Sequence, residues 1–217
     1  MKIVLDLIML IALAMLIGFQ YFPRAEHEII GVLWLIMATI HLYYNRCYLK
    51  GLLHGKWSTY RLIVLLLNAS VLISIAAAIV AGACISNYLF KGYLPSVVAR
   101  STLIHQIHIG ASYYALVFIG LHLGFHWSVW WKKLQARLNL KISMYITSVL
   151  AIIIALAGGY AAYLNELVGR LMLKHIFMTP AASGTAAEYF SYLAMLLGLF
   201  VLLGYGISHF LIKGKAK

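Results

Sequence analysis

Residues 27–45 read HEIIGVLWLIMATIHLYYN, and residues 108–126 read HIGASYYALVFIGLHLGFH. Each segment begins with a histidine, and a second histidine follows fourteen residues later, at His41 and at His122. Nearly all the residues between the two histidines are apolar. A helix needs about 20 such residues to cross the hydrocarbon core of a bilayer. Both segments therefore predict transmembrane helices that carry histidines at matched positions.

Apolar stretches of similar length recur along the chain, and 64% of its 217 residues are hydrophobic while only 10% are charged. A soluble domain needs a more polar surface than this composition supplies. We therefore predict an all-α integral membrane protein with six transmembrane helices, the first of which is long enough to be an uncleaved helix rather than a signal peptide. The approximate spans are 3–22, 28–45, 62–85, 107–131, 142–163 and 189–212.

The formal net charge of +12 is distributed unevenly among the loops. Basic residues cluster after the second, fourth and sixth spans, as Arg46, Lys50, Lys56 and Arg61, then Lys132, Lys133, Arg137 and Lys141, then Lys213, Lys215 and Lys217. The loops on the other side hold four of the five acidic residues. This positive-inside pattern predicts a multi-pass protein of a bacterial inner membrane with both termini cytoplasmic. The charge thus indicates orientation and contact with membrane lipid, without a nucleic-acid partner.

The two cysteines limit the redox chemistry that the chain can support. Cys47 and Cys84 lie near opposite faces of the predicted membrane domain, so they cannot form a disulfide with each other. No C-x-x-C-H motif is present, which excludes haem attached as in c-type cytochromes. No C-x-x-C pair is present either, which disfavours iron–sulfur clusters and thiol–disulfide exchange.

The fourteen-residue spacing places each pair of histidines on one stripe of its helix. Fourteen helical residues turn through about 1,400°, roughly 40° short of four turns, and rise about 21 Å. Each histidine-bearing span follows an apolar span and an outer loop, so the repeated unit is a helical hairpin, over about 3–50 and 62–131. Both histidine helices then run in the same direction. His27 can face His108 near the outer surface, and His41 can face His122 near the inner surface.

Two histidine pairs stacked through a membrane are what a di-haem site with bis-histidine ligation requires, because each iron takes one imidazole from each side. Ionisable groups inside a membrane are costly and tend to be functional. We predict that His27 and His108 bind an outer haem iron, and that His41 and His122 bind an inner one. Nearby glycines allow close approach of a flat macrocycle, although ordinary packing between helices explains them equally well; they are Gly31, Gly110, Gly120 and Gly124.

The remaining histidines have weaker assignments. His105 is the rival outer ligand, but its position rotates it about 100° away from the stripe. His126 lies one turn beyond His122, where a contact with a haem propionate or quinone and simple polar packing are alternatives. The other three lie in loops or at a helix end, where a solvated side chain is expected; they are His54, His175 and His209. Tryptophans near the basic side form an interfacial belt; they are Trp57, Trp127, Trp130 and Trp131.

The paired H-x13-H arrangement resembles the di-haem cytochrome b membrane anchors of respiratory formate dehydrogenases and nickel–iron hydrogenases. The stretches HEIIGVLWLIMATIHLYYNRCYLKGLL and HQIHIGASYYALVFIGLHLGFHW are also similar to an uncharacterised bacterial family of four-helix membrane proteins. The resemblance covers about residues 1–135. It implies two haems b, menaquinone or ubiquinone, and a partner subunit with iron–sulfur or flavin centres. His27, His41, His108 and His122 match its ligand positions, whereas Asn45 departs from the repeat at the position of His126.

The function expected from this pattern is electron transfer between a quinone pool and a redox partner subunit, rather than stand-alone catalysis. Residues 1–135 would form the di-haem four-helix bundle, and residues 136–217 two further helices joined by an outer segment at about 164–188. The first part of that segment, LNELVGRLMLKHIF, can lie on the membrane as an amphipathic helix.

Two alternative functions use the same histidines. One is a transmembrane reductase that delivers electrons to an external acceptor such as ferric iron. The other is a metal-cation or proton transporter with a histidine relay. A transporter is expected to have carboxylates or broken helices near the bilayer centre. The only acidic residue in a predicted helix body is Asp6, near the cytoplasmic end of the first helix.

Overall fold

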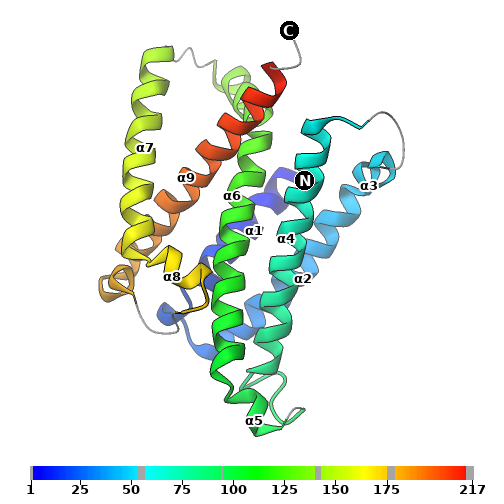
Figure 1. Ribbon diagram of the computed structural model, residues 1–217, viewed down its shortest axis with the longest axis vertical. Helices are drawn as coiled ribbons and strands as arrows, with labels where there is room; N and C mark the ends of the chain where they lie inside the picture. Colours follow the sequence, from blue (N-terminus) through cyan, green and yellow to red (C-terminus); the bar gives the residue numbers. More distant parts are fainter. Residues whose placement is uncertain (1, 53–56, 94, 140–142, 175–178, 214–217) are drawn as a thin grey trace.

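A computed structural model describes residues 2–52, 57–93, 95–139, 143–174 and 179–213, and these residues form helices and loops without strands. In chain order the elements are α1 (Lys2–Ile17), η1 (Phe19–Tyr21), α2 (Arg24–Tyr44), α3 (Arg46–Leu52), α4 (Thr59–Cys84), α5 (Ser96–Ala99), α6 (Thr102–Leu138), α7 (Met144–Leu164), α8 (Leu167–Leu171), η2 (Pro180–Ser183) and α9 (Ala186–Lys213). The long helices form three consecutive hairpins, α1–α2, α4–α6 and α7–α9 (Figure 1).

Five helices in the described part of the chain, α2, α4, α6, α7 and α9, are long and apolar enough to cross a membrane. The prediction of an all-α multi-pass membrane protein is confirmed at this level. Helix α1 is apolar but has only 16 residues, fewer than the roughly 20 that span a hydrocarbon core. It ends just before Gly18, a position at which the Phe190 ring of α9 leaves no room for a side chain.

The start of α1 and the end of α9 lie toward the same end of the bundle, which we call the inner end (Figure 1). Helix α3, the start of α4 and the last turns of α6 and α9 also lie at this end, so the three basic stretches are neighbours. The outer end holds the connections that follow α1, α4 and α7. Three long helices begin at serine caps whose hydroxyl accepts a backbone N–H, a local signal for a helix start; these caps are Ser58, Ser101 and Ser143.

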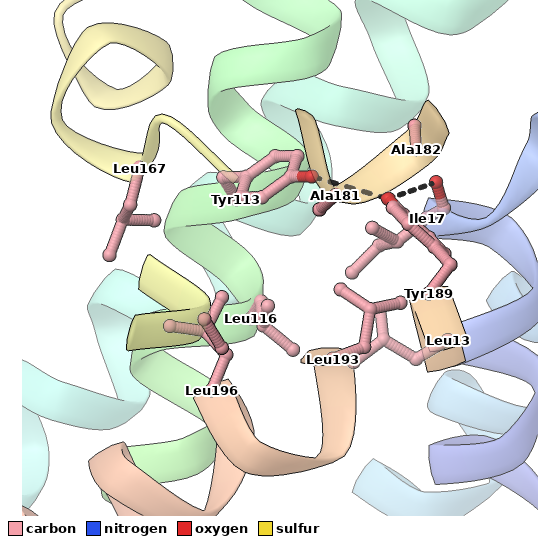
Figure 2. Packing of buried hydrophobic residues seen from close by; sticks show 11 residues of the cluster. Leu13, Ile17, Tyr113, Leu116, Leu167, Ala181, Ala182, Tyr189, Leu193 and Leu196 are labelled. Carbon is pink, nitrogen blue, oxygen red and sulfur yellow. Dashed lines mark hydrogen bonds between the residues drawn. The ribbon is translucent and has the colours of Figure 1, made fainter. Parts of the chain in front are cut away.

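The main hydrophobic core lies beside α6, on the side that α9 covers, and it draws residues from α1, α7, α8 and η2 (Figure 2). Its buried members are Leu13, Ile17, Tyr113, Leu116, Ala161, Leu167, Ala181, Ala182, Tyr189, Leu193 and Leu196. Helix α6 is therefore central, with α4 on one flank and α9 on the other (Figure 1). The last two long helices, α7 and α9, lie outside the part of the sequence that carries the histidine repeat, yet they supply Ala161, Tyr189, Leu193 and Leu196 to this core.

Glycines allow α6 and α9 to approach closely. A side chain at Gly124 would meet the backbone of α9 at Val201, and one at Gly204 would meet the backbone of α6 at Leu121. At Gly120, a Cβ atom would come within 2.6 Å of the Phe200 Cβ atom. Small residues at a crossing point are a usual means of packing helices inside a membrane, where burial of apolar area gives little driving force.

A buried polar network crosses the core near its outer end. The Tyr113 hydroxyl donates to Asn165 Oδ1 at 3.2 Å, and it lies 3.3 Å from the Tyr189 hydroxyl. The Tyr189 hydroxyl in turn donates to the carbonyl oxygen of Ile17 at 3.3 Å (Figure 2). Buried Arg170 donates through Nε to the Asn165 carbonyl oxygen at 3.2 Å, and its guanidinium lies 4.7 Å from the Tyr113 ring centre. The network joins α1, α6, α7, α8 and α9.

In residues 165–174, the described part of the segment after α7, the structure has no amphipathic helix on the surface, in contrast to the expectation for residues 164–177. Leu164 ends α7, and the helix within residues 165–174 is α8, five residues long. Both Leu167 and Arg170 of α8 are buried against the core. The Leu173 side chain that follows α8 packs against Gly110 of α6, where a larger residue would clash with it. Residues 175–178 lie outside the described ranges.

We expect Tyr113→Phe to lower the stability of the folded protein by roughly 1–3 kcal/mol, because it removes the hydroxyl that donates to the buried side-chain oxygen of Asn165, Oδ1. Thermal unfolding in detergent would measure the change. Tyr114→Phe is the matched control, since the neighbouring Tyr114 is 38% exposed. Equal melting temperatures for the two variants would contradict a stabilising role for this network.

Candidate functional site

Helices α2 and α6 run in the same direction, from the outer end to the inner end (Figure 1). Each therefore carries one of its two spaced histidines toward the outer end and one toward the inner end. His27 lies in the first turns of α2 and His41 in its last turn. In α6, His108 lies in the second turn and His122 lies near the middle of the helix, closer to the inner end. The structure thus places the four histidines at two levels, as the spacing predicted.

At the outer level, the imidazoles of His27 and His108 face each other. Their ring centroids are 6.0 Å apart and their planes are inclined at 84°. The His108 ring lies against Gly82 of α4, where a Cβ atom would come within 2.9 Å of it. His108 Nδ1 is 2.7 Å from the Ala78 carbonyl oxygen, also on α4. Helix α4 therefore fixes the position of the His108 ring beside His27.

The rival outer candidate, His105, is oriented differently. Its Nδ1 atom is 2.9 Å from the carbonyl oxygen of Ser101, one turn earlier in the same helix. The ring contact with His27 is made by His108. The geometry therefore favours His108 over His105 as the partner of His27, in agreement with the rotation expected from helix periodicity.

At the inner level, two polar side chains from neighbouring helices hold the histidines. His41 Nδ1 is 2.8 Å from Asp6 Oδ1 of α1, and His122 Nδ1 is 2.8 Å from Asn68 Oδ1 of α4. His122 also packs edge-on against His126, with 4.9 Å between ring centroids. The inner level thus holds His41 on α2 and the contacting rings of His122 and His126 on α6.

Sequence reasoning did not assign roles to Asp6 and Asn68. Each is a strongly polar side chain within an apolar helix, and such residues tend to have a specific partner because burial without one is costly. The spacing of residues in α4 is a second signal. Asn68 and Gly82 are fourteen residues apart, the same separation as that between the two histidines of α6. In the antiparallel α4–α6 pair, they contact His122 and His108 respectively.

The hydrogen bonds at Nδ1 leave the other ring nitrogen available for a ligand. A neutral imidazole carries one N–H, and donation of Nδ1–H to an oxygen leaves the lone pair on Nε2. Metal-ligating histidines usually have this arrangement. His41, His108 and His122 each have such an oxygen partner, from Asp6, Ala78 and Asn68. These three rings therefore have the orientation and partners of metal ligands.

Comparisons with models of protein families, with characterised proteins and with solved structures find no match to this chain. Its histidine geometry is the basis for a functional assignment.

The spacing of the outer pair fits two ligands on opposite sides of one metal ion. Metal–nitrogen bonds of about 2 Å place two opposed ligand nitrogens about 4 Å apart, and their ring centroids on the order of 6 Å apart. The observed distance between His27 and His108 centroids is 6.0 Å. The two rings are therefore close enough that a single metal ion could be held between them by one nitrogen from each.

The glycines of α6 do not line this site. Gly110 packs against Leu173, Gly120 against Phe200, and Gly124 against the backbone of α9. They lie roughly 120–200° around the helix from the His108 stripe, because each residue turns the helix by about 100°. The expectation that they allow close approach of a macrocycle is therefore wrong, and helix packing explains them. Gly31 of α2 faces Leu16 of α1.

The other predicted polar positions have separate surroundings. Asn45, the counterpart of His126 in the repeat, caps α2 by donating from Nδ2 to the His41 carbonyl oxygen at 2.9 Å. His126 itself is exposed on the face that carries His122. His209 is exposed and stacks on Tyr205 of its own helix. His54 and His175 lie outside the described residues.

Glu28 connects the start of α2 to the loop that follows α4. Its carboxylate accepts hydrogen bonds from the Ser86 hydroxyl at 2.7 Å and from the backbone N–H groups of Asn87 at 2.9 Å and Leu89 at 2.8 Å. Glu28 directly follows His27 in the chain. This connection holds the outer histidine of α2 in place relative to the helix that supports His108.

We expect Glu28→Ala to destabilise the outer end by about 1–3 kcal/mol, because four donors, including the Tyr88 backbone N–H, lose a charged acceptor. Hydrogen exchange should show faster exchange of the Asn87 and Leu89 amides. Glu26→Ala is the control, since Glu26 is an exposed carboxylate in the same turn of α2. Unchanged exchange in Glu28→Ala would show that the connection does not persist in the protein.

Proposed function

We propose that this chain is a membrane cytochrome b subunit that carries electrons across the bilayer through two bis-histidine haems b. The single observation that carries the proposal is the outer pair, His27 and His108, whose rings are 6.0 Å apart with His108 oriented through Nδ1. The second pair of histidines, His41 and His122, lies about 21 Å away along the helices and would give the same chain an inner site. Haem iron bound there would supply one-electron redox chemistry.

The surroundings of the histidines support a buried prosthetic group more than exchange of a cation. His108 is held by α4, and His41 and His122 are each held by a side chain from a neighbouring helix. Hydrogen bonds of this kind, to the ring nitrogen that does not bind the metal, fix the orientation of permanent ligands. A transport site would instead expose ligands alternately to the two sides, usually where helices are interrupted. Helices α2 and α6 are continuous through all four positions.

The proposal includes an orientation and partners. Residues 2–21, helix α1 with its turn and η1, form a sixth crossing, and both termini face the cytoplasm of a bacterial inner membrane. The shared inner end of the termini and basic stretches supports this orientation. A quinone pool and a subunit with flavin or iron–sulfur centres are the proposed redox partners, on the resemblance to di-haem membrane anchors.

Two haems b per chain are the expected result when the protein is purified from cells that make haem. Pyridine haemochrome analysis would measure the ratio of haem to protein, and reduced-minus-oxidised spectra would show low-spin b-type bands because both axial positions hold imidazole. His209→Ala is a suitable control for non-specific haem binding, since His209 is exposed on α9. A colourless protein, or covalently attached haem, would contradict the proposal.

A further inference from the structure

The proposed ligands differ in what each Nδ1 atom contacts. His41 faces a carboxylate oxygen of Asp6 at 2.8 Å. His108 and His122 face neutral oxygens, from the Ala78 carbonyl and the Asn68 amide. His27 Nδ1 is buried and has no hydrogen-bond partner among the described residues. The inner pair thus has one anionic partner, and the outer pair has none.

The Asp6 carboxylate is close enough to act on the ligand electronically. An ionised acceptor makes a stronger hydrogen bond than a neutral oxygen. It draws the Nδ1 proton toward itself and makes the opposite nitrogen a more basic ligand. A more basic ligand stabilises the oxidised iron relative to the reduced iron, which lowers its reduction potential.

Other charges near the two levels act less directly. Glu28 follows His27, but its two carboxylate oxygens are occupied by Ser86 and the backbone of the following loop. The basic residues at the inner end include Lys2, whose Nζ donates to the Tyr44 carbonyl oxygen at an exposed position. Solvent and salt screen such exposed charges. Among the described residues, the Asp6–His41 contact is the one ion pair between a carboxylate and a proposed ligand.

We propose that Asp6 is a positioning residue that tunes the inner site through His41, so that the inner haem has the lower reduction potential of the two. This inference rests on the proposed function. The favourable direction of electron transfer would then be from the inner end to the outer end. A reduced flavin or iron–sulfur centre at the inner end would be the electron donor, and a quinone at the outer end would be the acceptor.

Asp6→Asn tests the inference, because it removes the charge while keeping an oxygen of the same size as the acceptor for His41. Redox titration of the full chain, followed by the haem absorbance, gives both midpoint potentials. The inner haem is identified as the one lost in His122→Ala. We expect Asp6→Asn to shift the reduction equilibrium of the inner haem about tenfold toward the reduced state, or about 59 mV. The outer haem should keep its potential and serves as an internal control.

Two further measurements make the outcome decisive. Glu188→Gln is the matched control for the loss of a carboxylate, since exposed Glu188 bonds to Thr185 at the start of α9, and it should change neither potential. In the unaltered chain, the inner haem should titrate below the outer one. An inner potential above the outer one, or an Asp6→Asn shift that is absent, opposite in sign or confined to the outer haem, would overturn the inference. Absence of haem from the unaltered chain would instead overturn the proposed function itself.

Discussion

His122→Ala and His41→Ala should each remove one haem and leave the other in place. Each substitution takes away one of the two imidazoles that would hold the inner haem iron, and the outer pair is about 21 Å distant along the helices. Since metal ligation contributes directly to the stability of a site, occupancy should fall from two haems to one per chain. Haemochrome analysis combined with redox titration would measure both the number of haems and the potential of the one that remains.

The outer level provides the complementary test. His108→Ala should remove the other haem, because His108 is the ring that faces His27 at 6.0 Å. His105→Ala is the matched control, since His105 bonds to the carbonyl oxygen of Ser101 in its own helix, and this variant should keep both haems. The opposite result, with loss in His105→Ala and retention in His108→Ala, would require a different rotation of α6.

Gly204→Leu should prevent stable packing of α9 on α6. The added side chain would meet the backbone of α6 at Leu121, and backbone atoms cannot move aside as a flexible side chain can. Overpacking of a core costs roughly 1–3 kcal/mol, and a clash with backbone should reach or exceed the upper end of that range. The measurement is the yield of monodisperse protein in detergent together with its melting temperature.

Gly206→Leu is the control for this substitution. Gly206 lies two residues further along α9, and a Cβ atom there would contact nothing within 4 Å. The change in composition is identical, and leucine on a lipid-facing surface is favourable. Equal yields and melting temperatures for the two variants would mean that α6 and α9 do not meet at Gly204.

The glycines of α6 show where reasoning from the sequence was incomplete. Gly110, Gly120 and Gly124 are close in sequence to the histidines, but they lie on another side of the helix. Helix periodicity alone separates them from the histidine stripe. The identity of their neighbour, α9, could not be predicted, because a membrane helix that is apolar on all sides gives no periodic signal for the face that packs.

Asp6 and Asn68 show a different limit. Both stand out in the sequence as polar residues within apolar helices, and Asp6 was noted for that reason. Their partners depend on which helices are adjacent and on how far each is rotated. In the structure, α1 lies beside α2 and α4 beside α6, so Asp6 reaches His41 and Asn68 reaches His122. Only the assembled bundle determines these pairs.

The sequence by itself determined that this is an all-α membrane protein, because its apolar runs are long enough to cross a bilayer and its charge is confined largely to loops. It also determined that the histidines of α2 and of α6 lie on single stripes, because helix periodicity follows from local backbone geometry. The tertiary structure decided that Asp6 meets His41 and Asn68 meets His122, and that α9 completes the core behind α6. These features depend on contacts between residues distant in sequence, which are set by the fit of side chains across helices and leave no local pattern.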